Sequence, residues 1–119
     1  MRYLALVCDM VGSRSLPNRA EAQAALAAAL EAVNRQSRTA LISPYTITLG
    51  DEFQALYGGA DTVFPDFFSI LASIAPVKLR LAIGIGTLET LINPKQAIGM
   101  DGPAFHRSRA AIRGCLRRP

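Results

Sequence analysis

Short apolar runs along the chain predict four β-strands. Residues 2–8 form a nearly continuous apolar run, which is typical of a strand buried on both faces. Residues 44–49 and 53–57 are two strand-like segments on either side of a Gly-Asp turn, so they predict a β-hairpin. Residues 77–85 alternate aliphatic with basic positions and predict the fourth strand.

Apolar residues at helical spacing predict three helices. The first covers residues 19–36, and Asn18 and Glu21 have the spacing of a capping box at its start. The second covers residues 62–75, with Asp61 as its expected cap. The side chains expected to be buried are Ala22, Leu26, Ala29, Leu30 and Val33 in the first helix, Phe64, Phe67, Phe68, Leu71 and Ile74 in the second, and Phe105, Ile112 and Leu116 in the third.

The order of these elements predicts an α+β domain. Residues 86–102 show little periodicity and are expected to form an excursion with one short strand at most, before Pro103 begins the last helix. The order β-α-β-β-α-β is the ferredoxin-like pattern, here with an extra C-terminal helix. In that topology the first and third strands are antiparallel neighbours. The end of the first strand therefore lies beside the start of the third.

Two aspartates occupy these neighbouring places. Asp9 follows the first strand, and Asp51 lies in the hairpin turn before the third. Adjacent carboxylates repel one another unless they share a cation or a proton. A hard divalent ion such as Mg²⁺ satisfies them with oxygen ligands, commonly together with substrate phosphates. The alternative is structural, because an Asp after a strand or in a turn often caps the local backbone.

The loop after Asp9 fits a phosphate-binding role. Gly12 and Ser13 precede a helix, where free backbone amides can receive phosphate oxygens. Arg14 adds a cation that can contact the same oxygens. The residues therefore predict a magnesium-dependent nucleotide site, in which Asp9 and Asp51 hold the metal and the loop holds phosphate.

Composition narrows the class of protein. The 119 residues suit one domain, and 50% of them are hydrophobic, which is enough for an ordinary core. Residues 1–106 carry 8 basic and 9 acidic groups, a balance of −1, and five further basic residues follow. This pattern does not predict a uniformly basic nucleic-acid surface. Short apolar runs and two distant cysteines predict a cytoplasmic domain with free thiols and no membrane span.

Four motifs together resemble the SatD family and cover nearly the whole chain. They are Cys8-Asp9-Met10-Val11-Gly12-Ser13-Arg14, the segment Thr46 to Leu56, Ile83-Gly84-Ile85-Gly86, and the segment Ala97 to Arg109. Members of this family are often longer and carry what looks like a helix-turn-helix segment at the C-terminus. The resemblance implies a single SatD-like palm domain over residues 1–119, truncated before such a segment, which would be the only route to nucleic acid.

A more distant resemblance is to class III nucleotide cyclases. In those enzymes one metal carboxylate follows the first strand and a second lies in the hairpin, which implies Asp9 and Asp51 here. Residues 50–53 also resemble the last four residues of the Gly-Gly-Asp-Glu-Phe signature of diguanylate cyclases. Residues 100–109 resemble the late Gly-Asp-x-x-Asn-x-x-x-Arg motif of class III cyclases, which implies a catalytic role for Arg109. The Asn of that motif has no clear counterpart in this sequence. Class III cyclases work as head-to-tail dimers, so a homodimer is also implied.

Two functions stay open on the residues. The first is a magnesium-dependent nucleotide-binding palm domain with a regulatory role, either an enzyme or a degenerate cyclase-type sensor. The second is a non-catalytic dimerisation module of a DNA-binding transcription regulator. One face of the last helix carries His106, Arg109, Arg113 and Arg117. This face is a solvated cationic face, a phosphate-facing edge of the site, or part of a nucleic-acid or partner surface.

Overall fold

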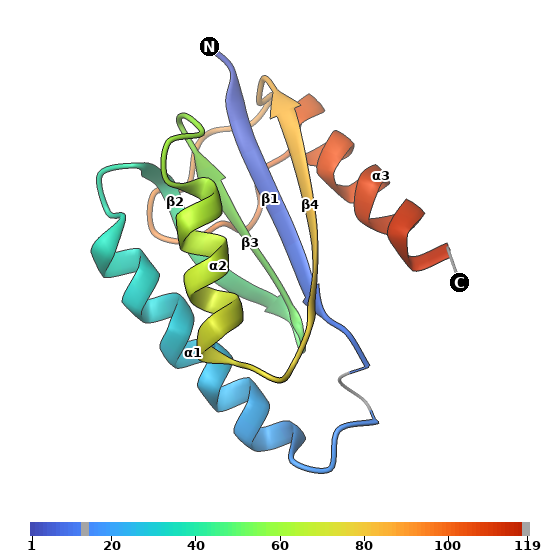
Figure 1. Ribbon diagram of the computed structural model, residues 1–119. Helices are drawn as coiled ribbons and strands as arrows, with labels where there is room; N and C mark the ends of the chain where they lie inside the picture. Colours follow the sequence, from blue (N-terminus) through green and yellow to red (C-terminus); the bar gives the residue numbers. More distant parts are fainter. Residues whose placement is uncertain (13–14, 118–119) are drawn as a thin grey trace.

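A four-stranded antiparallel sheet forms the centre of the structure, with strand order β2-β3-β1-β4 (Figure 1). This computed structural model describes residues 1–12 and 15–117, with side chains of the last helix described as far as Gly114. The elements are β1 (Tyr3–Met10), α1 (Arg19–Gln36), β2 (Leu41–Leu49), β3 (Glu52–Tyr57), α2 (Val63–Ser73), β4 (Leu79–Gly86) and α3 (Pro103–Arg117). The predicted ferredoxin-like order with an extra C-terminal helix is confirmed.

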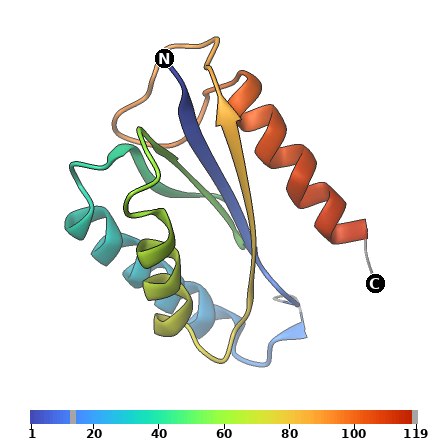
Figure 2. The ribbon, with the colours of Figure 1, turned by 45° about the horizontal axis from the view of Figure 1, so that its top comes forward.

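The helices cover the two faces of the sheet unequally. Helices α1 and α2 lie together on one face, and α3 lies on the other with the connection from residue 87 to 102 (Figures 1 and 2). Strand β1 is central, so it packs on both faces: Leu6 and Cys8 join the first core and Ala5 and Val7 the second. This double burial accounts for the continuous apolar run in β1.

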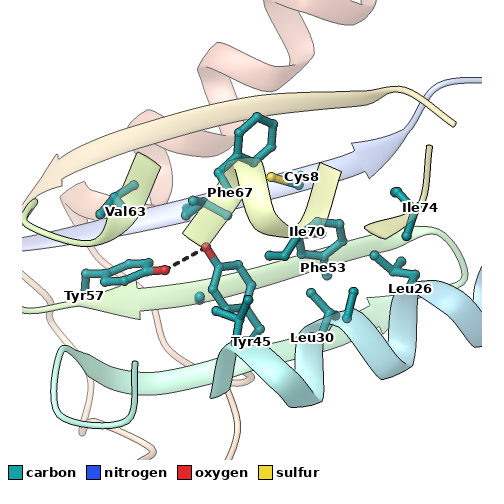
Figure 3. Packing of buried hydrophobic residues seen from close by; sticks show 14 of the residues in the cluster. Cys8, Leu26, Leu30, Tyr45, Phe53, Tyr57, Val63, Phe67, Ile70 and Ile74 are labelled. Carbon is teal, nitrogen blue, oxygen red and sulfur yellow. Dashed lines mark hydrogen bonds between the residues drawn. The ribbon is translucent and has the colours of Figure 1, made fainter. Parts of the chain in front are cut away.

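The larger core contains a hydrogen-bonded polar group. The hydroxyls of Tyr45 and Tyr57 lie 2.8 Å apart, and the Tyr57 hydroxyl donates to Asp66 Oδ2 at 2.8 Å (Figure 3). The Ser37 hydroxyl donates to Asp66 Oδ1 at 2.5 Å. Burial raises the pKa of both tyrosines, so both stay protonated. These bonds join α1, β2, β3 and α2 in one network, which satisfies a carboxylate that would otherwise be costly to bury.

Helix α3 packs very closely against strand β4. A Cβ at Gly84 would overlap the backbone of Ala104 and Ser108, so only glycine lets the helix sit this close to the strand. The first turn of α3 also packs on Gly86, which pairs with Tyr3 at the beginning of β1. Helix α3 therefore begins at the end of the sheet opposite to Asp9.

Two expected caps do not form. Asn18 stands at the N-cap of α1 but makes no side-chain cap hydrogen bond, because its backbone (φ −115°, ψ 53°) is not in the extended region from which such caps reach the first turn. The capping box with Glu21 is therefore wrong. Thr62, not Asp61, is the N-cap of α2, and it also makes no side-chain cap bond.

The buried face of α2 differs in part from the predicted one, because Phe67 and Ile74 are buried as expected but two other predicted residues are not. Phe64 and Phe68 are 50% and 59% exposed, whereas Val63 and Ile70 are buried. Both sides of this helix are apolar, so periodicity alone could not tell which one packs on the sheet. Residues 87–102 contain no strand, and β2 begins three residues earlier than predicted. Among the described residues, no helix combines the length and apolar character needed to cross a membrane.

Candidate functional site

The structure brings Asp9 and Asp51 together where β1 meets the β2–β3 hairpin. Asp9 pairs with Glu52 in the antiparallel register of β1 and β3, and the Met10 amide donates to the Asp51 carbonyl at 3.2 Å. Gly50 adopts a left-handed conformation (φ 55°), which makes the tight turn that carries Asp51. Two residues separated by 42 positions are therefore neighbours through sheet topology, as the sequence predicted.

The carboxylate of Asp9 is only partly satisfied. Arg80 lies directly opposite on β4, and its Nη1 atom is 3.5 Å from Asp9 Oδ2. Asp9 Oδ1 is buried and has no hydrogen-bond partner among residues 1–12 and 15–117. Burial raises the pKa of Asp9, Arg80 lowers it, and the negative charge of Asp51 raises it further. A buried, unpaired carboxylate oxygen is costly, which marks this atom as a candidate ligand for a cation.

The carboxylate of Asp51 is held by the first two turns of α1. Arg19 Nη2 lies 3.2 Å from Asp51 Oδ2, and Gln23 donates through Nε2 to Asp51 Oδ1 at 2.9 Å. The Asp51 side chain is 13% exposed, compared with 44% for Arg19. The hairpin turn is thereby tied to the start of α1 by one ion pair and one hydrogen bond.

The predicted phosphate loop is described in part. Gly12 has a left-handed backbone (φ 64°), and the Ser15 amide closes a turn onto the Gly12 carbonyl at 3.0 Å. The Val11 amide donates to the Lys78 carbonyl at 2.8 Å, which fixes the start of this loop against the segment before β4. Ser13 and Arg14 lie outside the described residues, so their predicted roles stay predictions.

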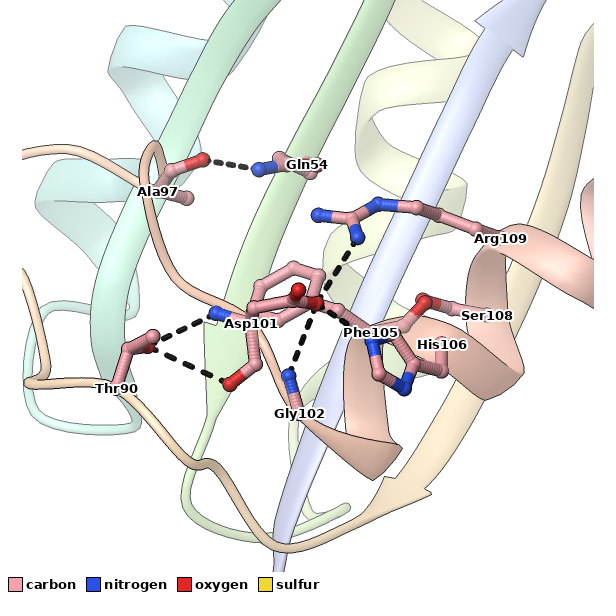
Figure 4. A network of polar contacts seen from close by, with 9 residues as sticks. All are labelled: Gln54, Thr90, Ala97, Asp101, Gly102, Phe105, His106, Ser108 and Arg109. Atoms are coloured by element: carbon pink, nitrogen blue, oxygen red, sulfur yellow. Dashed lines mark hydrogen bonds and ion pairs between the residues drawn. The ribbon is translucent and has the colours of Figure 1, made fainter.

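Arg109 belongs to a different cluster. Its Nη1 atom lies 3.2 Å from Asp101 Oδ1, and its guanidinium stacks over the Phe105 ring, 5.4 Å from the centroid (Figure 4). His106 Nε2 lies 2.9 Å from the same Asp101 oxygen. The Gly102 amide, followed by His106 and Arg109, lowers the pKa of Asp101. A carboxylate thus gathers three donors at the N-terminal end of α3.

This cluster is not part of the two-aspartate site within one chain. Asp101 precedes the turn of α3 that packs on Gly86, and Gly86 pairs with Tyr3. Asp9 stands at the other end of β1, opposite Arg80. Asp101 holds the side chain of Arg109 near the end of the sheet that contains Gly86 and Tyr3. Of the predicted site residues that the structure describes, Asp9, Asp51 and Gly12 lie at one end of the sheet, and Arg109 does not join them.

Sequence reasoning missed the cations beside the two aspartates, Arg19 and Arg80. A signal was available for Arg80. Strands β1 and β4 are adjacent in the predicted topology, and Arg80 is one of the basic residues that alternate with aliphatic ones in the fourth strand. Arg19 had no comparable signal. Its contact with Asp51 depends on how the start of α1 meets the hairpin turn, and that geometry is tertiary.

The residues present fit a hard cation bound with few protein ligands. Within residues 1–12 and 15–117, no group of three or more His, Cys, Asp or Glu side chains could hold a metal ion. Mg²⁺ does not need such a group, because it keeps several waters and takes one or two carboxylates plus phosphate oxygens. The orphaned Asp9 Oδ1 atom beside Asp51 meets that smaller requirement.

Several solved structures that are similar to this chain are nucleotide cyclase domains. A bacterial light-regulated adenylyl cyclase matches 99% of this chain and 72% of its own, with a TM-score of 0.68 and 10% identity. The dimeric guanylyl cyclase domain of RhoGC from Blastocladiella emersonii covers 91% and 71%, with a TM-score of 0.60 and 14% identity. The guanylate cyclase domain of RhGC from Catenaria anguillulae, solved in complex with GTP, covers 91% and 70%, with a TM-score of 0.60 and 13% identity. The chain therefore has the palm fold of cyclase domains.

The sequence also defines the family. Residues 3–115 match the SatD family, so the chain belongs to the SatD family, as the four motifs predicted. No significant match was found among curated protein sequences. The structural similarity to the cyclase domains establishes the shared fold. Because the sequence identity is low, the chemistry has to be argued from the residues of this chain.

Proposed function

We propose that this domain binds a nucleotide through a magnesium ion held by Asp9 and Asp51. The observation that carries the proposal is the buried Asp9 Oδ1 atom, which has no hydrogen-bond partner in the described part of the chain and lies beside the turn that holds Asp51. A divalent cation would satisfy this oxygen and offset the repulsion between the two carboxylates. The Gly12 loop follows β1 directly after Asp9, and phosphate would lie against this loop.

Each residue would have a distinct task. Asp9 and Asp51 would provide the carboxylate oxygens for the metal, while the backbone turn at Gly12, with Ser13 and Arg14, would receive phosphate oxygens. The metal, when bound, would neutralise phosphate charge and polarise the phosphoryl group. The hydrogen bond between Val11 and Lys78 keeps the loop next to the carboxylates.

The relatives in fold support nucleotide binding as a class of function. One neighbour was solved with GTP, and another, a rhodopsin-guanylyl cyclase with converted specificity, was solved with ATPαS. Those ligands belong to those proteins. For this chain they indicate which ligands to test first, and the residues around Asp9 give no reason to prefer one base.

We propose a regulatory role for nucleotide binding by the single chain. The candidate catalytic Arg109 pairs with Asp101 at the opposite end of the sheet from Asp9. A nucleotide at Asp9 would meet an Arg109 only from a second copy of the chain, so catalysis would require a homodimer. The domain would bind nucleotide without that step and would report its presence through the loop and α1.

Isothermal titration of GTP and ATP, with and without Mg²⁺, tests this function. We expect metal-dependent binding by the wild type and a loss of roughly tenfold or more in affinity for Asp51→Asn, because a charged ligand is removed. Asp61→Asn is the matched control, since Asp61 is an exposed aspartate away from the site. Equal affinity for both variants, or no binding under any condition, would overturn the proposal and favour the dimerisation module.

A further inference from the structure

Both carboxylates of the candidate metal site already have cations from within the chain. Arg80 of β4 pairs with Asp9 at 3.5 Å, and Arg19 of α1 pairs with Asp51 at 3.2 Å. Gln23 adds an uncharged hydrogen bond to Asp51. The two arginines come from different elements and reach the two aspartates independently, so each carboxylate has its own counter-ion.

The charge of this group opposes a bare metal ion. The two carboxylates and the two guanidinium groups that pair with them sum to zero, and a divalent cation would raise the charge of these four groups to +2 unless an arginine left. The Asp9 and Asp51 side chains are 21% and 13% exposed, so solvent screens these interactions less than it screens a surface pair. A divalent cation alone is therefore expected to bind weakly, unlike at an unpaired acidic site.

The same arginines favour an anion that arrives with the metal. A di- or triphosphate group brings at least two negative charges, which return the site to neutrality or below. Arginine also matches phosphate oxygens geometrically, because its planar fork donates two parallel hydrogen bonds. The groups that oppose the metal by itself would thus become ligands for the phosphate chain.

We propose that Arg19 and Arg80 make this a site for a divalent cation and a polyphosphate group together, in which each binds weakly without the other. The inference rests on the proposed metal site at Asp9 and Asp51. It assigns the ligand class by its phosphate chain, at least a diphosphate, and not by its base. Because linkage is reciprocal, the factor by which polyphosphate tightens metal binding equals the factor by which metal tightens polyphosphate binding.

The test uses the whole chain and inorganic triphosphate, which has no base. Titration of Mg²⁺ without and with triphosphate, corrected for the complex that the two form in solution without protein, gives the coupling factor, which we expect to be roughly 5–150-fold for the wild type. Arg80→Gln and Arg19→Gln should each bind Mg²⁺ alone several times more tightly and should lower the coupling factor. Arg35→Gln is the matched control, because Arg35 is an exposed arginine in the last turn of α1.

The outcomes separate this inference from the proposed function. Wild-type coupling in both arginine variants would overturn the role of the arginines, while loss of GTP binding in Asp51→Asn would leave the metal site standing. A wild type that binds Mg²⁺ with GTP but not Mg²⁺ with triphosphate would overturn this inference alone, and no binding of either would overturn both. Arg19 is 44% exposed, so its replacement keeps the test valid even where Arg80→Gln impairs folding, and circular dichroism checks both variants.

Discussion

Asp9 and Arg80 face each other across β1 and β4, with 3.5 Å between Asp9 Oδ2 and Arg80 Nη1, while Asp9 Oδ1 is buried and has no hydrogen-bond partner among the described residues. One oxygen of the carboxylate is thus neutralised and the other is left unsatisfied. Natural proteins keep such a cost mainly where a group serves function. Stability measurements can detect this cost without any ligand.

Asp9→Asn should raise the free energy of unfolding at pH 7. Because burial raises the pKa of Asp9 in the folded state, the folded protein holds this proton more tightly than the unfolded chain does. The contribution of Asp9 is therefore most favourable at low pH and declines as the pH rises through the folded pKa. Urea unfolding at pH 7 and pH 3.5 measures this contribution. The variant should be more stable than the wild type at pH 7, and this difference should disappear at pH 3.5. A loss of stability at pH 7 would show that the Arg80 pair outweighs burial.

Asp101→Asn should behave in the opposite way. The Gly102 amide, His106 and Arg109 lower the pKa of Asp101 in the folded state, so its contribution is present above the unfolded value and disappears as the pH falls through the folded pKa. The variant should be less stable than the wild type at pH 7 and equal to it in strong acid. Thermal unfolding as a function of pH provides the measurement. An equal melting temperature at pH 7 would contradict the proposed stabilisation by these three donors.

Gly84→Ala should destabilise the fold by roughly 1–3 kcal/mol or more, because the new methyl group overlaps the backbone of Ala104 and Ser108. Gly114→Ala, on α3 itself, is the paired control, since no atom of the described residues lies within 4 Å of its added Cβ. Replacing a glycine inside a helix should stabilise by about 0.5–1 kcal/mol. Urea midpoints that shift in the same direction for both variants would contradict the close packing of α3 on β4.

Tyr57→Phe should cost roughly 1–3 kcal/mol of stability, because it leaves Asp66 Oδ2 buried without its donor. The aromatic ring and its packing against Tyr45 are retained, so the change isolates the hydroxyl group. Tyr3→Phe is the control, because Tyr3 is a half-buried tyrosine at the start of β1. Its free energy of unfolding should lie within about 0.5 kcal/mol of the wild-type value. Equal stability of the two variants in urea would show that the tyrosine network adds nothing to the core.

The sequence predicted the parts of the fold that depend on periodicity and topology. The order of elements followed from alternation and helical spacing, and the meeting of Asp9 with Asp51 followed from that order alone. The orientation of α2 was predicted only in part. Phe67 is buried as expected, but Phe64 and Phe68 make the solvent side of the helix as apolar as its buried side. Local spacing at Asn18 suggested a cap that the backbone angles do not permit.

The chemistry of the site was predicted less completely than its position. The sequence pointed to the two carboxylates but not to the arginines that neutralise them, since the Arg19 contact depends on tertiary packing. It also grouped Arg109 with Asp9, whereas the structure gives Arg109 to Asp101. A motif match along the chain carries no information on which end of a sheet a helix residue faces.

Paramagnetic broadening by Mn²⁺ tests the central claim most directly, because it locates the metal. With GTP present, small additions of Mn²⁺ in place of Mg²⁺ should first broaden the amide signals of Met10, Val11, Gly12 and Asp51 in the NMR spectrum of the whole chain. Asp51→Asn should abolish this pattern while the spectrum stays folded. First broadening at Asp101 and His106, or no selective broadening with either nucleotide, would contradict a metal–nucleotide site at Asp9 and Asp51.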